Sequence, residues 1–366
     1  MFTPDDHRFM SRALELAGEG LFSTTPNPRV GCVIVKDGLI VGEGWHRRAG
    51  EPHAEVLALA QAAHQAAGAT AYVTLEPCSH FGRTPPCADA LVGARVARVV
   101  AAMEDPNPSV NGRGLDRLRA VGIDVRCGLL RQEAIELNIG FVSRMTRGRP
   151  WVRAKMATSL DGLSALPDGR SQWITGEAAR ADGHAWRARA CAILTGIGTV
   201  RDDDPQLTVR GIATSRQPIK VLVDSRLEID RNARLIAGAP LWIACAVDQP
   251  DKARELRDRG CELIHLPNGS SKVDLGELMA ELGRRGINEL HAEAGPKLAG
   301  SLLREGLVDE LLMYVAPGLL GKGLAAFDLD APATLDERMQ LHFTGIERIG
   351  PDLRLLARFS GRGLPT

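Results

Sequence analysis

The apolar run VGCVIV at residues 30–35 has the length and composition of a strand that is buried on both faces of a sheet. The polar turn KDG at 36–38 follows it, and residues 39–45 return as a second strand. The Ala- and Leu-rich stretch 54–67 predicts a helix, and 71–75 predicts another strand. This alternation of helices and strands predicts an α/β layered fold.

The rest of the chain extends this pattern. A first helix is expected from Thr3-Pro4, since Thr suits the N-cap position and Pro the first helical position. Further helices are predicted near 87–92, 176–189, 251–259, 274–285 and 297–305. Further strands are predicted at 95–103, 151–157, 191–195, 220–224, 241–246, 289–293, 311–315, 343–348 and 353–358.

A short polar linker interrupts the pattern near residues 144–150, where three arginines flank Gly148 and Pro150. A second series of strands and helices begins directly after it. The chain has 366 residues, enough for two or three domains at about 100–200 residues each. We therefore expect one domain over residues 1–147 and a second over 148–366.

Composition restricts the classes of function. Lys+Arg and Asp+Glu both number 45, and aromatic residues make up 4% of the chain, which argues against a nucleic-acid binder with a basic groove and stacking aromatics. No apolar run approaches the roughly 20 residues that span a bilayer. The N-terminus MFTPDD lacks the basic-then-apolar order of a signal peptide. These features predict a cytoplasmic protein without nucleic-acid or membrane partners.

The seven cysteines are an odd number spread over the whole chain, which favours reduced thiols over a disulfide framework. Most of them are expected to be small buried hydrophobic residues. Cys78 and Cys87 differ, because they lie in a loop rich in Pro and Gly rather than in an apolar run. A packing role alone would be unusual for a thiol in such a loop.

His53, Cys78 and Cys87 together offer one imidazole and two thiolates, the three protein ligands that a catalytic Zn2+ site needs beside an open position for water. Glu55 follows His53 by two residues, so on a regular helix it would point to another side. It could then lie beside the metal without ligating it. That arrangement is typical of a general acid/base that moves protons between activated water and a substrate nitrogen.

The pattern departs from the general zinc-deaminase signature, in which two residues separate the cysteines. Here eight residues separate Cys78 from Cys87. The alternatives are a structural zinc site, plain packing of the thiols, or a His53 that only caps a helix. Glu55 discriminates between them, because a structural site has no use for a carboxylate beside an open metal position.

The loop CSHFGRTPPC at 78–87 and the segment NPRVGCV at 27–33 resemble the RibD/RibG family of bifunctional riboflavin biosynthesis deaminase–reductases. The resemblance covers nearly the whole chain and implies a cytidine-deaminase-like α/β/α first domain. It also implies that Asn27, His80 and Arg83 contact the pyrimidine or its phosphoribosyl arm.

Three motifs stand out in the second half of the chain: KMATSLDG at 155–162, LTGIGTV at 194–200 with the aspartates 202–204 after it, and HAEAGPKLAGS at 291–301. Lys155 lies inside a predicted buried strand, where its stem could pack while its amine reaches water. The Gly-x-Gly stretch predicts a turn that lets backbone approach a ligand. The third motif predicts a strand, a turn and a helix N-terminus able to hold a phosphate. Solvated aspartates and an empty strand–helix turn are the plainer alternatives.

These motifs resemble the reductase half of the same family, which implies a dihydrofolate-reductase-like α/β fold that uses NADPH. The positions where the family binds the dinucleotide are here Ala157, Trp173, Thr199, Asp203, Ser225, Gly295, Pro296, Lys297, Leu298, Ala299, Gly300 and Ser301. The positions where it binds the substrate are Ser171, Arg187, Leu207, Arg210 and Glu293. A guanidinium suits a ribose 5-phosphate because it pairs with phosphate in a fork.

The resemblance implies two successive reactions on small phosphoribosyl pyrimidines. Zinc-dependent hydrolysis removes the 2-amino group of a diaminopyrimidinone as ammonia, and NADPH then reduces C1′ of the ribosylamino group. Lys155 and Asp203 are the candidates for orienting or protonating the opened sugar. A homo-oligomer is expected. The rival functions are a deaminase of RNA or DNA, a zinc-stabilised binding module without catalysis, and an enzyme with only one active half.

Overall fold

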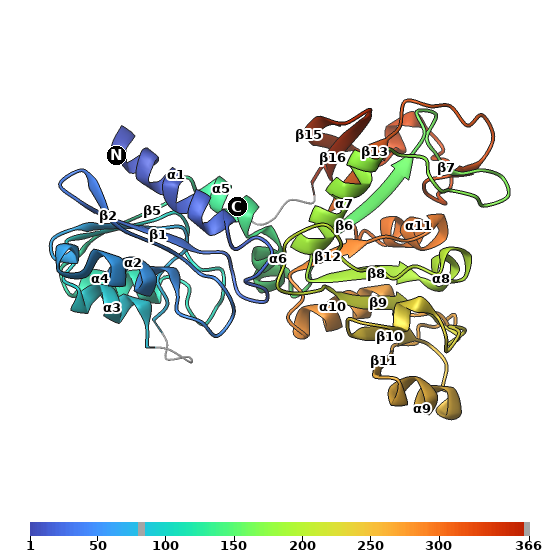
Figure 1. Cartoon of the computed structure of the whole chain (residues 1–366), viewed down its shortest axis with the longest axis horizontal. Coiled ribbons are helices and arrows are strands. Elements are labelled where there is room, and N and C mark those ends of the chain that lie inside the picture. Colours follow the sequence, from blue (N-terminus) through green and yellow to red (C-terminus); the bar gives the residue numbers. More distant parts are fainter. Residues whose placement is uncertain (80–84, 362–366) are drawn as a thin grey trace. The chain divides into compact units, whose positions relative to one another are not determined.

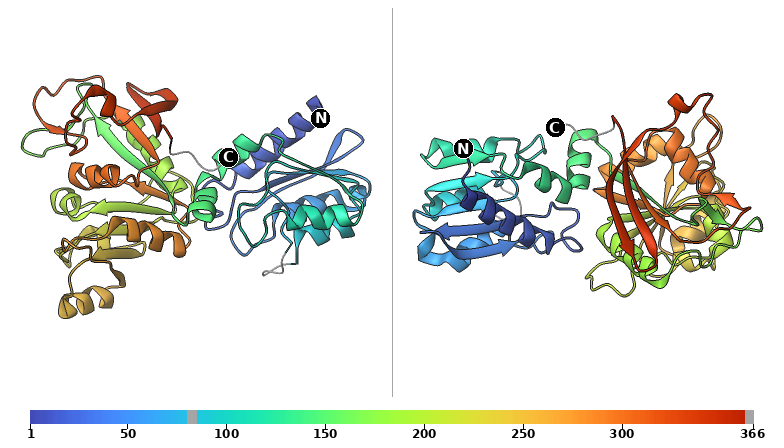
Figure 2. Two further views of the ribbon diagram at one scale, coloured as in Figure 1. Left: turned by 180° about the vertical axis from the view of Figure 1, so that it is seen from behind. Right: turned by 90° about the horizontal axis from the view of Figure 1, so that it is seen from above.

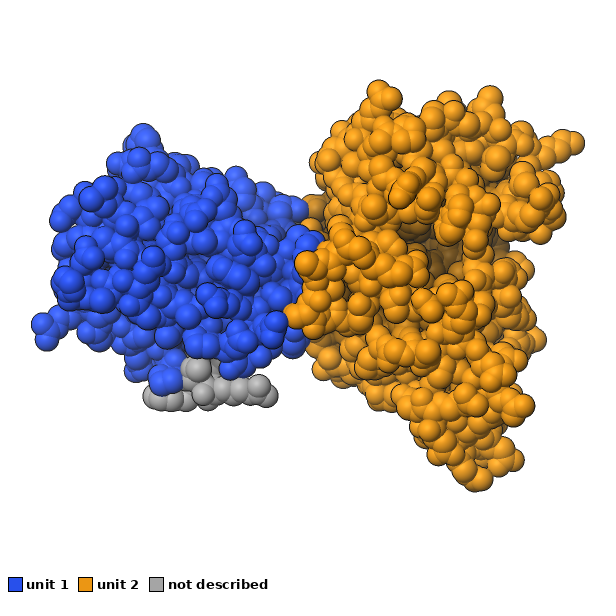
Figure 3. Space-filling view, viewed as in Figure 1, with its two compact units in different colours: residues 1–147 blue, residues 148–366 orange. Residues whose placement is uncertain are grey.

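The computed structural model describes residues 1–79 and 85–361. The chain divides into two compact units, Met1–Arg147 and Gly148–Thr366 (Figure 3). Each unit is built around its own sheet and its own buried apolar clusters. Among the described residues, no helix combines the length and the apolar character that crossing a bilayer requires.

Unit 1 contains a five-stranded sheet in the order β2-β1-β3-β4-β5 (Figure 1). Strand β1 pairs antiparallel with β2 and β3, while β3, β4 and β5 run parallel. The strands are β1 (Gly31–Lys36), β2 (Leu39–Trp45), β3 (Thr70–Val73), β4 (Arg98–Ala101) and β5 (Asp124–Cys127).

Helices cover both faces of this sheet (Figure 1). Helix α1 packs on one face of β1, and α2, α3 and α4 share an apolar cluster on the opposite face. The helices are α1 (Pro4–Gly18), α2 (Ala54–Ala62), α3 (Cys87–Gly93), α4 (Arg113–Ala120), α5 (Arg131–Leu137) and α6 (Ile139–Arg147). A 3-10 turn, Ala63–Ala66, follows α2.

Unit 2 contains a nine-stranded sheet in the order β11-β10-β9-β8-β12-β6-β13-β16-β15. The strands from β11 to β13 in that order are parallel, and β16 and β15 add antiparallel pairs at one edge. The strands are β6 (Trp151–Thr158), β8 (Ala192–Gly196), β9 (Ile219–Val223), β10 (Leu241–Cys245), β11 (Cys261–His265), β12 (Glu289–Ala292), β13 (Glu310–Val315), β15 (Leu341–Ile349) and β16 (Asp352–Phe359).

The helices of unit 2 also lie on both faces of the sheet, as the views in Figure 2 show. They are α7 (Glu177–Arg189), α8 (Ile197–Asp203), α9 (Pro250–Asp258), α10 (Leu275–Arg284) and α11 (Pro296–Arg304). Alternate strand residues face α10 and α11 on one side and α7, α8 and α9 on the other. β7 (Leu163–Ala165) and β14 (Leu324–Ala325) pair in a separate two-stranded antiparallel sheet, and 3-10 turns lie at Arg234–Ile236 and Leu335–Glu337.

The structure confirms the predicted α/β class and most predicted elements, with two corrections. The predicted helix 54–67 is α-helical only to Ala62, because Ala63 takes a left-handed φ of 49°. The predicted Gly-x-Gly turn is wrong, since β8 ends at Gly196 and α8 begins at the next residue. Gly196 serves packing instead: a Cβ there would lie 3.1 Å from Leu298 of α11.

Candidate active sites

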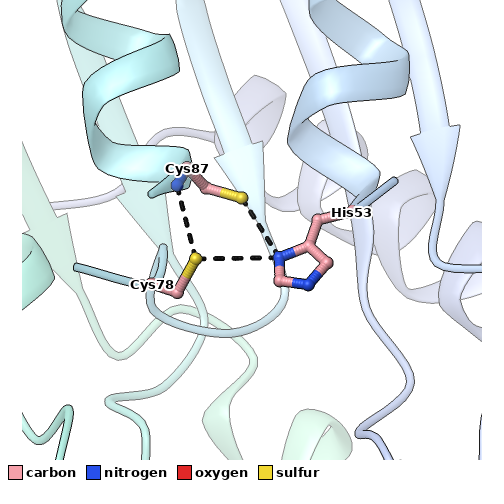
Figure 4. Close-up of side chains that lie close together, drawn as sticks. All are labelled: His53, Cys78 and Cys87. Carbon is pink, nitrogen blue, oxygen red and sulfur yellow. Dashed lines mark hydrogen bonds between the residues drawn. The ribbon is translucent and has the colours of Figure 1, made fainter. Parts of the chain in front are cut away.

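Three candidate metal-ligand side chains meet in unit 1, where the N-terminal ends of α2 and α3 lie side by side (Figure 4). His53 is the N-cap residue of α2, Cys87 is the first residue of α3, and Cys78 lies in the loop after β3. The Nδ1 and the two Sγ atoms all lie within 4.8 Å of one another. The imidazole Nδ1 is 3.2 Å from Cys87 Sγ and 3.7 Å from Cys78 Sγ.

The chemistry of this donor set fits a zinc ion. Cys78 Sγ accepts a hydrogen bond from the Cys87 backbone N–H at 3.3 Å. Hydrogen bonds from Cys87 and His53 lower the pKa of the Cys78 thiol, so the ligating thiolate form of Cys78 is favoured. One nitrogen and two sulfurs are the protein ligands of a known class of catalytic zinc site.

Glu55 lies in the first turn of α2, two residues after His53, and its side chain is buried. Burial raises the pKa of its carboxyl to about 7. A cavity of about 620 Å3 within unit 1 is lined by Glu55, His53 and Cys78. A carboxyl group and two of the three candidate ligands therefore line one cavity.

Glu76 anchors the loop that carries Cys78. Its carboxylate accepts the backbone N–H groups of Asp105, Gly112 and Gly114 at 3.0, 2.8 and 2.7 Å. Cys78 follows Glu76 by two residues in the chain. The carboxylate thus holds the loop that carries one metal ligand against the segment that leads into α4.

In unit 2, three of the predicted dinucleotide positions lie at the carboxyl edge of the parallel strands. Thr199 is in α8 after β8, Ser225 follows β9, and Gly295 caps α11 after β12. The Gly295 N–H donates to Thr199 Oγ1 at 3.1 Å, which joins the starts of α8 and α11. Strand order reverses between β8 and β12, the place where open α/β sheets bind ligands.

A charged cluster lies beside this edge. Arg187 of α7 forms a two-pronged ion pair with Glu293, with Nη2 to Oε2 at 2.8 Å. Arg187 Nη1 also donates to the Thr208 carbonyl at 3.2 Å. Burial would raise the pKa of Glu293, but Arg187 outweighs it and holds that pKa well below its usual range. Arg187 is therefore paired and mostly buried rather than an exposed charge of α7.

Lys155 lies half-buried in β6 next to this pair. Burial lowers the pKa of its amine, and the charges of Glu293 and Arg187 act on it in opposite directions. Its Nζ is 5.9 Å from the centre of the Tyr314 ring. The structure thus brings Lys155, Arg187 and Glu293 together.

Comparison with known proteins gives a family match within each unit. Residues 3–103 match the cytidine and deoxycytidylate deaminase zinc-binding region, and residues 150–355 match the RibD C-terminal domain. The RibD protein of Escherichia coli is 50% identical over 96% of this chain and 98% of that relative. The RibD protein of Aquifex aeolicus is 41% identical over 95% and 97%.

Two solved structures are similar over nearly the whole chain. Acinetobacter baumannii RibD superposes with a TM-score of 0.91 at 43% identity, covering 97% of this chain and 99% of that one. A Thermotoga maritima deaminase–reductase gives 0.86 at 32% identity, again covering 97% and 99%.

The chain belongs to the RibD family. These matches confirm the predicted fold class and the bifunctional deaminase–reductase of riboflavin biosynthesis.

Asn27 lines the unit 1 cavity together with His46, a residue that the sequence analysis did not single out. The Asn27 amide nitrogen is 3.1 Å from His46 Nε2, and His46 Nδ1 is 3.3 Å from the Pro52 carbonyl. The carbonyl needs a donor, so Nδ1 carries the proton and Nε2 accepts from Asn27. No sequence spacing signals His46, because Asn27 precedes it by 19 residues in another segment.

Other predicted positions of the RibD reductase half are less closely grouped. Asp203 ends α8, is exposed and lies 3.3 Å from the Gln172 amide. Trp173 is 70% exposed beneath the Arg180 guanidinium. Leu207 is buried in the apolar cluster around β9 and β10. The remaining positions are Ala157 in β6, Ser171 before Trp173, Arg210 in an exposed loop, and Pro296, Lys297, Leu298, Ala299, Gly300 and Ser301 within α11. His80 and Arg83 lie outside the described residues.

Proposed function

We propose that unit 1 hydrolyses the 2-amino group of a phosphoribosylated diaminopyrimidinone, and that unit 2 reduces the deaminated product with NADPH. The Thermotoga relative is named a diaminohydroxyphosphoribosylaminopyrimidine deaminase and 5-amino-6-(5-phosphoribosylamino)uracil reductase. The two compact units would then be the deaminase domain, 1–147, and the reductase domain, 148–366. The observation that carries the proposal is the buried Glu55 carboxyl beside three metal-ligand atoms at one cavity.

The deaminase chemistry follows from the placement of Glu55. A zinc ion on His53, Cys78 and Cys87 would supply an acidified water molecule as nucleophile. The Glu55 carboxyl would take a proton from the attacking water and deliver it to the departing nitrogen. The new carbon–oxygen bond forms, the carbon–nitrogen bond breaks, and ammonia leaves. Asn27, oriented by His46, would hold the pyrimidine.

The reductase chemistry is assigned to the carboxyl edge of the nine-stranded sheet. NADPH would supply a hydride to C1′ of the opened sugar. The residues around Thr199, Ser225 and Gly295 would hold the dinucleotide, with its phosphates at the first turn of α11, where backbone N–H groups have no partner within the helix. The product would be a ribitylamino-uracil phosphate.

Lys155 is better placed than Asp203 to orient or protonate the sugar, because Lys155 lies next to the predicted substrate residue Glu293 and Asp203 contacts Gln172 instead. Arg187 is already engaged with Glu293. Arg210 is exposed and is therefore the stronger candidate for the substrate's 5-phosphate. A homo-oligomeric state and a cytoplasmic location stay predictions.

Glu55→Ala tests the proposal in the full-length protein. We expect ammonia release to fall by about 10²-fold or more, the contribution of a positioned acid/base group, while zinc content stays that of the unaltered protein. Reduction of supplied 5-amino-6-(5-phosphoribosylamino)uracil should persist. Ammonia release at the unaltered rate would refute the role of Glu55, and loss of both reactions would refute the assignment of separate sites.

A further inference from the structure

We propose that His184 is a positioning residue of the reductase site, whose neutral imidazole holds the backbone that presents Arg210 to the substrate's phosphate. The inference rests on the reductase function proposed above. His184 lies in α7, and neither the family resemblance nor the charge pattern of the sequence pointed to it.

One face of α7 grips the loop that carries Arg210. His184 and Arg187 are three residues apart and so share a helix face. The Arg210 backbone N–H donates to His184 Nδ1 at 3.2 Å, and Arg187 Nη1 donates to the Thr208 carbonyl at 3.2 Å. Two side chains of one helix turn therefore hold residues 208 and 210 of the same loop.

Val209, which lies between these two residues, is held by Gln217 rather than by α7. The Val209 N–H donates to Gln217 Oε1 at 2.7 Å, and the Gln217 amide donates back to the Val209 carbonyl at 3.3 Å. Leu207, which is buried, begins this segment in the apolar cluster. The His184 bond is thus the last in a series, and it holds the residue whose side chain is proposed to meet the phosphate. Losing it would release Arg210 while leaving the start of the segment anchored.

The hydrogen bond also sets the protonation state of His184. Nδ1 accepts from a backbone N–H, so a neutral ring carries its proton on Nε2. A second proton would go to Nδ1 and place two donors opposite each other. The bond to Arg210 exists only while the imidazole is neutral.

Charged groups from four elements face His184: Arg187 of α7, Arg210 of the loop, Glu293 after β12 and Lys155 of β6. Burial lowers the pKa of His184, the three cations lower it further, and Glu293 opposes them. The net direction is downward, so the ring is neutral at neutral pH. The hold on Arg210 is present above this lowered pKa and is lost as the pH falls through it.

The test compares the unaltered protein with His184→Asn and His184→Ala, all as full-length chains. Asparagine can place an oxygen near the position of Nδ1, so it keeps an acceptor that does not titrate. His265→Ala, at an exposed histidine of β11, is the matched control. The KM for 5-amino-6-(5-phosphoribosylamino)uracil and the kcat are measured with NADPH from pH 5 to 8. The affinity for ribose 5-phosphate is measured by calorimetry over the same range.

At pH 8 we expect His184→Ala to raise KM and weaken ribose 5-phosphate binding by about tenfold, the worth of one hydrogen bond, with kcat unchanged. His184→Asn and His265→Ala should match the unaltered protein there. On acidification, KM of the unaltered protein should rise more steeply than that of His184→Asn. The titration of the substrate's phosphate is common to both and cancels in this comparison.

Two results would overturn the inference: His184→Ala binds ribose 5-phosphate as tightly as the unaltered protein, or His184→Asn keeps the unaltered pH dependence. Failure of the proposed function looks different. In that case the unaltered protein does not oxidise NADPH with the uracil substrate, while the effect of His184 on ribose 5-phosphate binding still supports or overturns its positioning role.

Discussion

A single buried carboxylate, Asp6, ties the first helix to the sheet of unit 1. It accepts the Thr3 N–H at 2.9 Å, the Tyr72 hydroxyl at 2.7 Å and two Arg98 N–H groups at 2.8 and 3.2 Å. Burial would raise the pKa of Asp6, but the bonds from Arg98, Thr3 and Tyr72 outweigh it and hold that pKa well below its usual range. The charged form of Asp6 is therefore part of the folded state.

Asp6→Asn should lower the free energy of unfolding by about 3 kcal/mol at neutral pH, because it leaves a partly buried Arg98 without its carboxylate. The folded-state pKa is depressed, so this contribution is present above the ordinary carboxyl pKa of about 4 and is lost as the pH falls below it. Urea unfolding at several pH values measures both effects. Asp5→Asn, at an exposed ion pair, is the control and should change stability by less than about 1 kcal/mol. Equal effects of the two changes would contradict this account.

Arg210→Ala should raise the reductase KM for the phosphorylated substrate by about tenfold or more, since a guanidinium–phosphate pair is a charge-assisted hydrogen bond. The ammonia-releasing reaction should be unaffected. Steady-state kinetics with NADPH measures the change. Arg216→Lys, in the same loop region, is not a suitable control, because the Arg216 guanidinium donates hydrogen bonds to three backbone carbonyls. Arg254→Ala, at a largely exposed side chain of α9, is suitable. An unchanged KM would remove Arg210 from the phosphate site.

At this scale residue type and order were enough to single out candidate metal ligands, and their role as zinc ligands stays a prediction. His53, Cys78, Cys87 and Glu55 were all placed from their spacing, and they meet in the structure. His46 could not be predicted, because its importance lies in a bond across the fold to Asn27.

Glycines in β1 and β2 let helices α1 and α2 pack very close to the sheet of unit 1, and this packing positions the candidate metal site. A Cβ on Gly31 of β1 would lie 2.0 Å from the Ala13 carbonyl of α1. A Cβ on Gly44 of β2 would lie 2.4 Å from the Ala54 carbonyl and 2.8 Å from Leu57 Cβ, both in α2. The first turn of α2, which carries Glu55 and follows His53, therefore packs directly against the sheet.

Gly44→Ala should displace the start of α2 and with it the metal site. We expect a loss of about 2 kcal/mol of stability from overpacking, together with weaker zinc retention. Thermal unfolding and zinc content after dialysis measure the two effects. Gly93→Ala, at the end of α3 where a Cβ meets nothing within 4 Å, should leave both unchanged. Full zinc retention in Gly44→Ala would contradict the proposal that the packing of α2 on Gly44 positions the metal site.

Elements with a strong apolar period were predicted from sequence, and short or polar ones were not. Strand β5 is half exposed and α4 buries few apolar side chains beyond Leu115 and Leu118, so neither carried a clear signal. Helix α8 was missed because Gly196 at its N-cap and Gly198 in its first turn are typical of a turn. Its position depends on packing against Leu298, which is distant in sequence.

For the whole molecule, the described ligand cluster lies within unit 1 and the predicted reductase residues lie within unit 2. Zinc removal should therefore abolish ammonia release and spare reduction of the supplied uracil intermediate. Treatment with a chelator, followed by assays of both reactions and by readdition of zinc, measures this. Loss of the reductase reaction without unfolding would contradict separate sites.

The most direct test of the central claim incubates the purified full-length protein with the diaminopyrimidinone phosphate, with and without NADPH, and follows ammonia and cofactor oxidation in one sample of known zinc content. We predict ammonia release in both samples and, with NADPH present, oxidation of one cofactor molecule for each ammonia released. Zinc-loaded protein that releases no ammonia, or that oxidises NADPH before any ammonia is released, would contradict the account.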